Sequence, residues 1–94
     1  MNTHYNKYIA EFIGTTVFLT IVLKSGNDKY VIVAGLLAAI IFMGSVSGGH
    51  FNPAISFMNM IDSSSTFSKT DCAGYVVAQL LGALCAIFLA KRLP

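Results

Sequence analysis

A helix-breaking stretch at residues 48–53, between two long apolar segments, is the feature that most constrains the fold. Asn52 is a good N-cap residue, and Pro53 suits the first helical position because its missing N–H would have no partner there. A helix is therefore predicted to begin at Asn52. The apolar sequence after it persists only to about Ile61, so this helix is about 13 Å long, against about 30 Å for a hydrocarbon core. It can enter a membrane but cannot cross it.

The backbone before this short helix also favours a re-entrant segment. Gly48 and Gly49 allow a sharp turn between close neighbours, and irregular backbone at membrane depth is tolerated only where protein buries it or where it lines a wet cavity. Past the turn we expect the chain to run extended through His50, with the carbonyl oxygens of residues 48–50 in a row. The stretch is thus predicted to be a re-entrant half-helix whose amino end lies at mid-membrane.

The composition independently indicates an integral, multi-pass membrane protein. Of the 94 residues, 55% are hydrophobic and only 11% are charged, which leaves no room for a soluble catalytic domain. Apolar runs predict spans at about residues 8–23, 31–46 and 72–89, with the half-helix at about 52–61. The predicted fold class is an all-α membrane protein with three transmembrane helices and one re-entrant half-helix, in one unit over residues 1–94. The formal charge of +2 is small and scattered, so no nucleic-acid partner is expected.

Small residues spaced four apart predict where these helices pack, because lipid offers no hydrophobic drive to helix association. The second span contains one such pair, Gly35 and Ala39. The third span contains a longer row: Gly74, Ala78, Gly82 and Ala86.

Three segments resemble a known family. SGGHFNPAIS at residues 47–56 closely resembles the signature SGGHxNPAVT/S of the aquaporin and glycerol-facilitator family, AEFIGT at 10–15 resembles that family's first-helix opening, and YVVAQLLGA at 75–83 resembles its third helix. The resemblance covers nearly the whole chain but half of the family's fold, because family members carry two such repeats in inverted orientation. It implies a passive channel for water or small uncharged solutes in the lipid bilayer. No enzyme activity, cofactor or metal is expected.

Asn52 is the central candidate site residue. As an N-cap its side-chain oxygen can accept from the N–H of Ala54 or Ile55, which leaves its NH₂ donors to hold a water or alcohol oxygen. The positive end of the half-helix lies at the same place and disfavours cations. The alternative is a cap buried in an ordinary helix contact. The predicted pore-lining residues are Gly48, Gly49, His50, Asn52, Pro53 and Ala54, and His50 is expected to contribute its carbonyl rather than acid–base or metal chemistry.

Glu11 is the only carboxylate within a span, and an intramembrane carboxylate needs a partner. The resemblance implies that Glu11 anchors the re-entrant loop by accepting hydrogen bonds from it, and that Gln79 is an inward polar residue beside it. Two alternatives remain open. Glu11 could carry protons in a transporter, or it could lie near the headgroups, one helical turn from Tyr8.

Solute selection is where the chain departs from the family pattern. The family relies on an arginine after its second motif and on a bulky residue in the second helix. Here Ile55 follows the motif, and the single arginine, Arg92, lies at the far end of the last span. Ile32 would occupy the second-helix position in an ungapped match and Ala34 if two residues are skipped. Neither is a polar filter, so no preference between water and glycerol is predicted.

A complete pore needs a second half. An inverted second copy, a separate partner chain, or a second repeat missing from a partial reading frame could supply it; the alternative function is a non-conducting membrane interaction subunit. Orientation is also open, because the resemblance places the amino terminus in the cytoplasm while the positive-inside tendency weakly prefers the reverse. This conflict suggests the hypothesis that the chain inserts both ways and that opposed copies pair.

Overall fold

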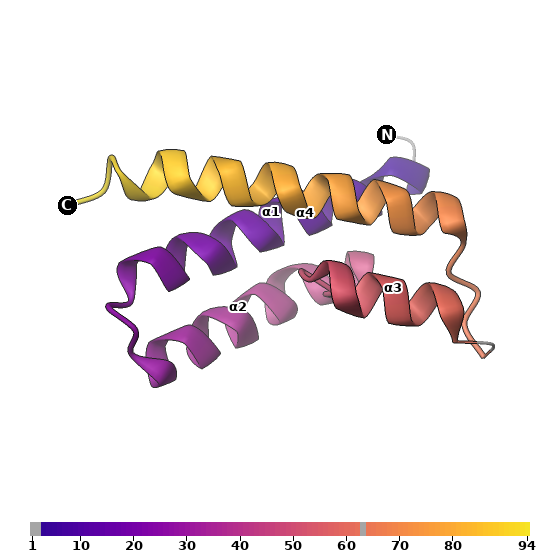
Figure 1. Ribbon diagram of the computed structural model, residues 1–94, viewed down its shortest axis with the longest axis horizontal. Helices are drawn as coiled ribbons and strands as arrows, with labels where there is room; N and C mark the ends of the chain where they lie inside the picture. The colour runs from indigo at the N-terminus through magenta and orange to yellow at the C-terminus, as the bar shows by residue number, and fades with distance from the viewer. Residues whose placement is uncertain (1–2, 63) are drawn as a thin grey trace.

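The computed structural model describes residues 3–62 and 64–94, with side chains from Tyr5 onward, and the regular secondary structure of these residues is α-helical throughout (Figure 1). The helices are α1 (Thr3–Lys24), α2 (Lys29–Ser47), α3 (Pro53–Ile61) and α4 (Lys69–Ala90). Of these, α1, α2 and α4 are long and apolar enough to cross a membrane. The short helix α3, with 9 residues, is about 13 Å long. The predicted all-α fold class is confirmed.

The three long helices lie side by side, with α1 in contact with both α2 and α4, while α3 contacts α4. In Figure 1, α3 begins near the middle of the long axis and runs to the end at which α4 begins, which is also the end toward which α2 runs. The molecule measures 42 × 27 × 19 Å, so α3 covers about a third of its length. The chain thus turns inward after α2 and returns along α3.

Side-chain caps begin the long helices α2 and α4. Asp28 Oδ1 accepts from the N–H groups of Tyr30 and Val31, at 2.9 and 3.3 Å, and starts α2. Ser68 Oγ accepts from Asp71 N–H at 3.0 Å and starts α4. The helices begin two to five residues before the predicted spans because helical backbone continues through the polar residues that flank each apolar run.

The small-residue rows, which the sequence predicts to be packing faces, lie against α1. Gly35 of α2 faces Ile21, and a Cβ built on this glycine would lie 2.7 Å from Ile21 Cγ2. Gly82 of α4 faces Thr15, and a Cβ built on it would lie 3.0 Å from Thr15 Cβ. Ala86, one turn further along α4, is completely buried. Close approach of the backbones therefore makes α1 the central helix of the bundle.

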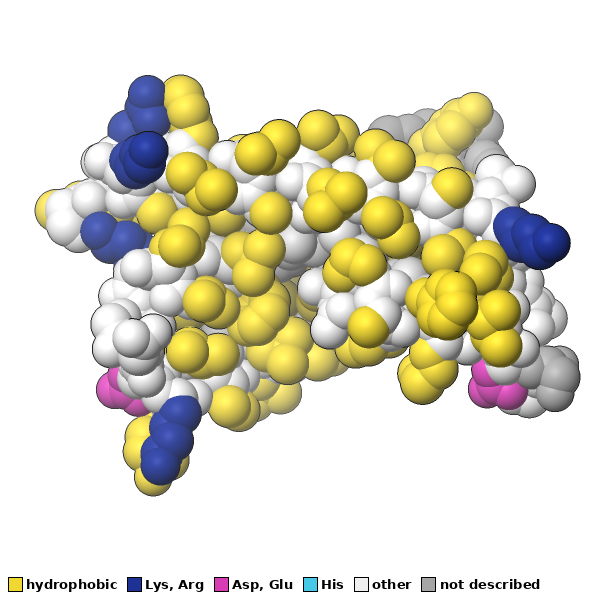
Figure 2. Space-filling view, viewed as in Figure 1, with side chains coloured by type: hydrophobic (Ala, Val, Ile, Leu, Met, Phe, Trp, Pro, Cys, Tyr) yellow, Lys and Arg dark blue, Asp and Glu magenta, His cyan; other side chains and the backbone are white. Residues whose placement is uncertain are grey.

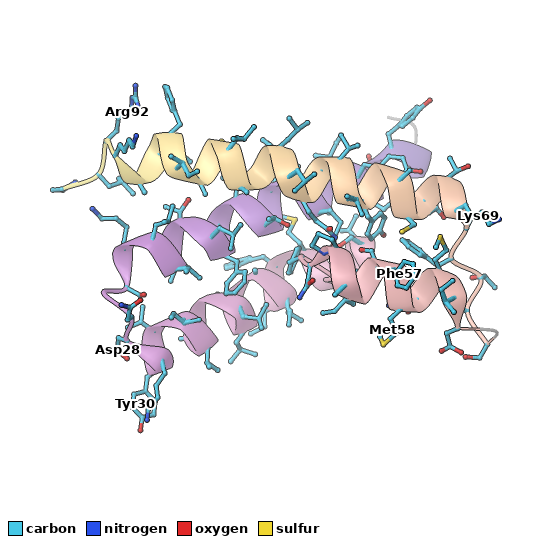
Figure 3. The ribbon with its side chains drawn as sticks, in the orientation of Figure 1. Asp28, Tyr30, Phe57, Met58, Lys69 and Arg92 are labelled. Carbon is cyan, nitrogen blue, oxygen red and sulfur yellow. The ribbon has the colours of Figure 1, made fainter. Side chains whose placement is uncertain are left out.

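The outer surface is apolar along the middle of the molecule and charged at its ends. Hydrophobic side chains cover the middle of the face in Figure 2, and Lys, Arg, Asp and Glu side chains lie toward its two ends. Large exposed side chains include Phe42 on α2 and Leu84 on α4. Figure 3 shows Asp28, Tyr30 and Arg92 at one end and Lys69 at the other. This distribution suits a bundle whose sides face hydrocarbon and whose ends reach the two interfaces.

Candidate functional site

The loop between α2 and α3 reverses the chain within residues 48–52. Gly48 and Gly49 have left-handed backbone, with φ of 89° and 67°, and the Gly48 N–H donates to the Gly44 carbonyl at 2.7 Å where α2 ends. Glycine adopts this conformation without steric cost. A five-residue reversal requires such tight turns, which is why the two glycines precede the cap.

Phe51 departs from the extended run that the sequence predicts. Its φ is 52°, in the left-handed region that side-chain-bearing residues seldom adopt. Its ring is buried against α1 at Gly14, where any added Cβ would overlap the ring. The prediction of extended backbone past His50 is therefore wrong for Phe51, and the extended residue is Asn52, with φ −159°. Burial of the ring holds Phe51 in this conformation.

Glu11, on α1, is the centre of the hydrogen-bond network beneath this loop. Its exposed fraction is 0%, so it does not face headgroups. Oε1 accepts from the Phe51 N–H at 2.8 Å and from Gln79 Nε2 at 3.0 Å. Oε2 accepts from Ser47 Oγ at 2.7 Å and from the His50 N–H at 3.1 Å. Four donors on two oxygens suit a carboxylate, which only accepts.

Serine and glutamine side chains extend this network to every helix. Gln79, on α4, also donates from Nε2 to Ser56 Oγ of α3 at 2.9 Å. Ser56 Oγ lies 2.9 Å from His50 Nδ1. Ser47, at the end of α2, accepts the Gly49 N–H at 3.1 Å. One carboxylate on α1 is thus connected to α2, the loop, α3 and α4.

The His50 ring, besides its contact with Ser56, packs against two aromatic rings. The ring centroids of Phe67 and Tyr75 lie 4.9 and 4.8 Å from that of His50. The Tyr75 hydroxyl donates to the Ser47 carbonyl at 2.6 Å. These contacts account for the His50 side chain as a packed, hydrogen-bonded group.

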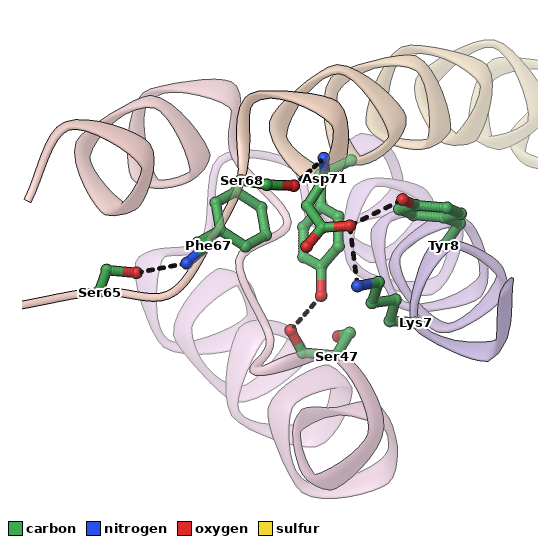
Figure 4. A network of polar contacts seen from close by, with 8 residues as sticks. Lys7, Tyr8, Ser47, Ser65, Phe67, Ser68 and Asp71 are labelled. Carbon is green, nitrogen blue, oxygen red and sulfur yellow. Dashed lines mark hydrogen bonds and ion pairs between the residues drawn. The ribbon is translucent and has the colours of Figure 1, made fainter. Parts of the chain in front are cut away.

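A second polar cluster joins α1 to α4 at the same end of the molecule (Figure 4). The Asp71 carboxylate forms an ion pair with Lys7 at 2.8 Å and accepts from the Tyr8 hydroxyl at 2.8 Å. Asp71 also donates its N–H to the capping Ser68. The second turn of α1 and the first turn of α4 are therefore tied together.

The predicted pore-lining residues lie at the amino end of α3, where Asn52, Pro53 and Ala54 are exposed. Asn52 Oδ1 accepts from the Ala54 N–H at 2.8 Å, as the cap prediction requires. Within the described part of the chain, no hydrogen bond is made by Asn52 Nδ2 or to the carbonyls of residues 48–50. The segment thus combines an exposed donor group at Asn52, carbonyl groups without a hydrogen-bond partner among the described residues, and the positive end of a helix.

The two candidate filter residues lie apart from this segment. Ile32 is half-buried and Ala34 is exposed, both near the start of α2, at the end marked by Asp28 and Tyr30 in Figure 3. Arg92 lies at that end too, with its guanidinium 3.3 Å from the Phe88 ring centroid and Nη1 donating to the Phe88 carbonyl at 2.9 Å. No contact joins either filter residue to Asn52 among the described residues.

Sequence reasoning missed three members of the site: Ser47, Ser56 and Tyr75. Each is a polar group inside or beside an apolar run, which was the available signal. Ser47 and Ser56 are also the first and last residues of the motif that carries the family resemblance.

The chain is similar in sequence to known proteins over most of its length. Residues 1–93 match the family model described as major intrinsic protein. The chain is 39% identical over 88 residues to glycerol uptake facilitator protein-like 6 of Lactiplantibacillus plantarum, covering 85% of this chain and 40% of that protein. It is 33% identical over 97 residues to aquaglyceroporin AqpS of Rhizobium meliloti, covering 87% and 41%.

A plant relative matches in the same way. Aquaporin PIP2-7 of Arabidopsis thaliana is 30% identical over 103 residues, covering 93% of this chain and 36% of that protein. The chain therefore spans about two fifths of the length of the curated relatives it matches. No solved structure matches it.

Proposed function

Because the chain belongs to the major intrinsic protein family, we propose that it forms one half of a passive channel for water or small uncharged solutes. It is an integral, multi-pass membrane protein, with three helices able to span the bilayer. The observation that carries the proposal is the hydrogen bonding of the Asn52 side chain. Its oxygen is held by the Ala54 N–H at 2.8 Å, so the side chain is oriented while its NH₂ group stays available at the exposed amino end of α3.

The proposed mechanism exchanges a solute's hydrogen bonds with water for hydrogen bonds with this segment. Asn52 Nδ2 donates to the oxygen of the passing water or alcohol, and the carbonyls of Gly48, Gly49 and His50 accept its hydrogens in succession. A neutral solute is thereby dehydrated at little cost. The amino end of α3 carries about half a positive charge, which opposes the passage of cations.

The proposed role of Glu11 and Gln79 is to hold the loop at this geometry. Glu11 accepts the N–H groups of His50 and Phe51, at 3.1 and 2.8 Å, so neither has to turn toward the pore to find a partner. The loop carbonyls can then face the solute. An acceptor of this kind is needed because an unpaired buried N–H costs about 1–3 kcal/mol.

A second half is required to close the pore around this face. We propose that an inverted second copy, a separate partner chain, or a further part of a longer protein provides it. The exposed amino end of α3 would then meet its counterpart near the midplane.

A second candidate function is a non-conducting membrane interaction subunit. The observation that favours it is an open apolar groove of about 590 Å³ between α1 and α4, lined by Tyr8, Phe12, Gly74, Val77 and Leu81 among others. A groove with a glycine in its wall suits close packing against another membrane helix.

Osmotic swelling of vesicles that contain only this chain tests whether copies of the chain form a pore by themselves. A channel should raise water permeability above that of protein-free vesicles, and Asn52→Asp should reduce the rise because it replaces donors with a negative charge. Asn59→Asp is the matched control, since Asn59 is on the same short helix and its Nδ2 donates to the Ile55 carbonyl at 2.9 Å. Permeability no higher than that of bare lipid would exclude a pore formed by copies of this chain alone, which leaves the non-conducting subunit or a channel completed by a different second half.

A further inference from the structure

A recess at the far end of the bundle from the re-entrant loop differs from the other grooves in having two lysines in its wall. It lies where α1 and α4 both end, has a volume of about 240 Å³, and is lined by Leu23, Lys24, Ile87, Ala90 and Lys91. Three of its five lining residues are aliphatic and two are cationic.

The charges of the whole molecule favour an anion at this end. Lys24, Lys29, Lys91 and Arg92 are opposed there by Asp28, a formal charge of +3, whereas Lys7 and Lys69 at the other end are balanced by Asp62 and Asp71. Two helices end and one begins at the recess, so the helix dipoles contribute roughly half a negative charge in total. The surplus of positive charge remains.

The Lys24 side chain is already directed across the recess. Its Nζ donates to the Leu93 carbonyl at 3.1 Å, which spans from the end of α1 to the segment after α4. One of its three N–H donors is used in this bond, and two remain. Arg92 is engaged with Phe88, so Lys24 and Lys91 are the cations that line the recess.

We propose that this recess binds the headgroup of an anionic phospholipid. The phosphate lies between Lys24 and Lys91, and the start of an acyl chain lies against Leu23, Ile87 and Ala90. The ends of membrane-spanning helices lie at headgroup depth, and basic pockets between such helices are suited to anionic lipid headgroups. The aliphatic wall distinguishes this ligand from free phosphate, which would leave that wall in water. The site is separate from Asn52 and does not depend on the proposed channel function.

Mass spectrometry of the detergent-solubilised chain under non-denaturing conditions tests the site. Phosphatidylglycerol and phosphatidylcholine with identical acyl chains are added in turn, and the bound fraction is measured. We expect phosphatidylglycerol to bind more tightly, and Lys24→Gln and Lys91→Gln each to weaken its binding about fivefold. Lys69→Gln removes the same charge at the opposite end and should leave binding unchanged, while Lys24→Arg should retain it.

Several outcomes would overturn the proposal. An equal loss in Lys69→Gln would mean that the lipid responds to overall charge, and equal binding of phosphatidylcholine would mean that the recess takes an acyl chain without reading the headgroup. Complete displacement of the lipid by millimolar inorganic phosphate would assign the site to phosphate alone. Circular dichroism of each variant confirms that a loss of binding is not a loss of helix, and Lys24→Arg binding as poorly as Lys24→Gln would refute the role of the charge.

Discussion

Replacing Glu11 should destabilise the fold by an amount that depends on how many loop donors lose their acceptor. In Glu11→Leu, all four donors to the carboxylate are released, but two have a second partner. Ser47 Oγ lies 3.4 Å from the Met43 carbonyl, and Gln79 Nε2 keeps Ser56 Oγ at 2.9 Å. The N–H groups of His50 and Phe51 have no such alternative among the described residues. Each buried unpaired donor costs about 1–3 kcal/mol, so these two donors should lower the free energy of unfolding by about 2–6 kcal/mol.

Glu11→Gln should cost about half as much. The amide keeps one acceptor oxygen, which can serve either the Phe51 and Gln79 pair or the Ser47 and His50 pair. One backbone N–H then stays unpaired, and the loss is about 1–3 kcal/mol. The ordering of wild type, glutamine and leucine is the quantity that tests the reasoning.

Thermal unfolding in detergent, followed by far-ultraviolet circular dichroism, measures this ordering. Asp62→Leu is the matched control because it removes an exposed carboxylate whose hydrogen bonds go to Ser64. Its midpoint should stay close to that of the wild type. If Glu11→Leu is as stable as Glu11→Gln, the carboxylate does not hold the loop, and the proposed anchoring role is wrong.

Three further predictions concern the loop and its orientation in the membrane. Gly14→Ala should destabilise the fold by about 1–3 kcal/mol, because the added methyl group overpacks against the Phe51 ring. Gly44→Ala is the control and should be tolerated, since its Cβ would lie 3.3 Å from Ile40 Cγ2. Equal unfolding midpoints for the two variants would contradict the tight contact at Gly14. Asn52→Asp should admit potassium into vesicles, measured with a potassium-sensitive dye, and an unchanged ion barrier would count against cation exclusion at α3. Carboxyl-terminal reporter fusions, one active only inside the cell and one only outside, should both give signal; activity of a single reporter would refute dual insertion.

The short helix could be predicted from residues that are neighbours in the sequence. Capping chemistry alone predicts a start at Asn52, and the end of the apolar run predicts a last residue near Ile61. In the structure Asn52 is the cap, and α3 runs from Pro53 to Ile61. The row of small residues on α4 likewise predicted a packing face without knowledge of its partner. These features depend on neighbours in sequence, so one sequence is enough to find them.

The loop conformation and the full set of anchors depend on contacts between distant residues. Nothing in the sequence around Phe51 indicates left-handed backbone, because that conformation is set by the space beside Gly14 of α1. Ser56 and Tyr75 join the network only in the folded bundle, where Ser56 Oγ of α3 lies beside His50 Nδ1 and the Tyr75 hydroxyl of α4 donates to the Ser47 carbonyl at the end of α2. The resemblance supplied Glu11 as an anchor, but the geometry was needed to identify its four donors.

The network around Glu11 also affects the order in which the chain folds during its synthesis. The hydroxyl of Ser47 is 36 residues downstream of Glu11 and the Phe51 N–H is 40 residues downstream, so at about 5–20 residues per second a ribosome supplies them about 2–8 s later. The Gln79 amide, 68 residues downstream, follows later still. Throughout that interval the first span carries a carboxylate without its native donors, and water, lipid headgroups or the insertion machinery must solvate it. The amino-terminal helix therefore completes its folding only after the re-entrant loop has been made.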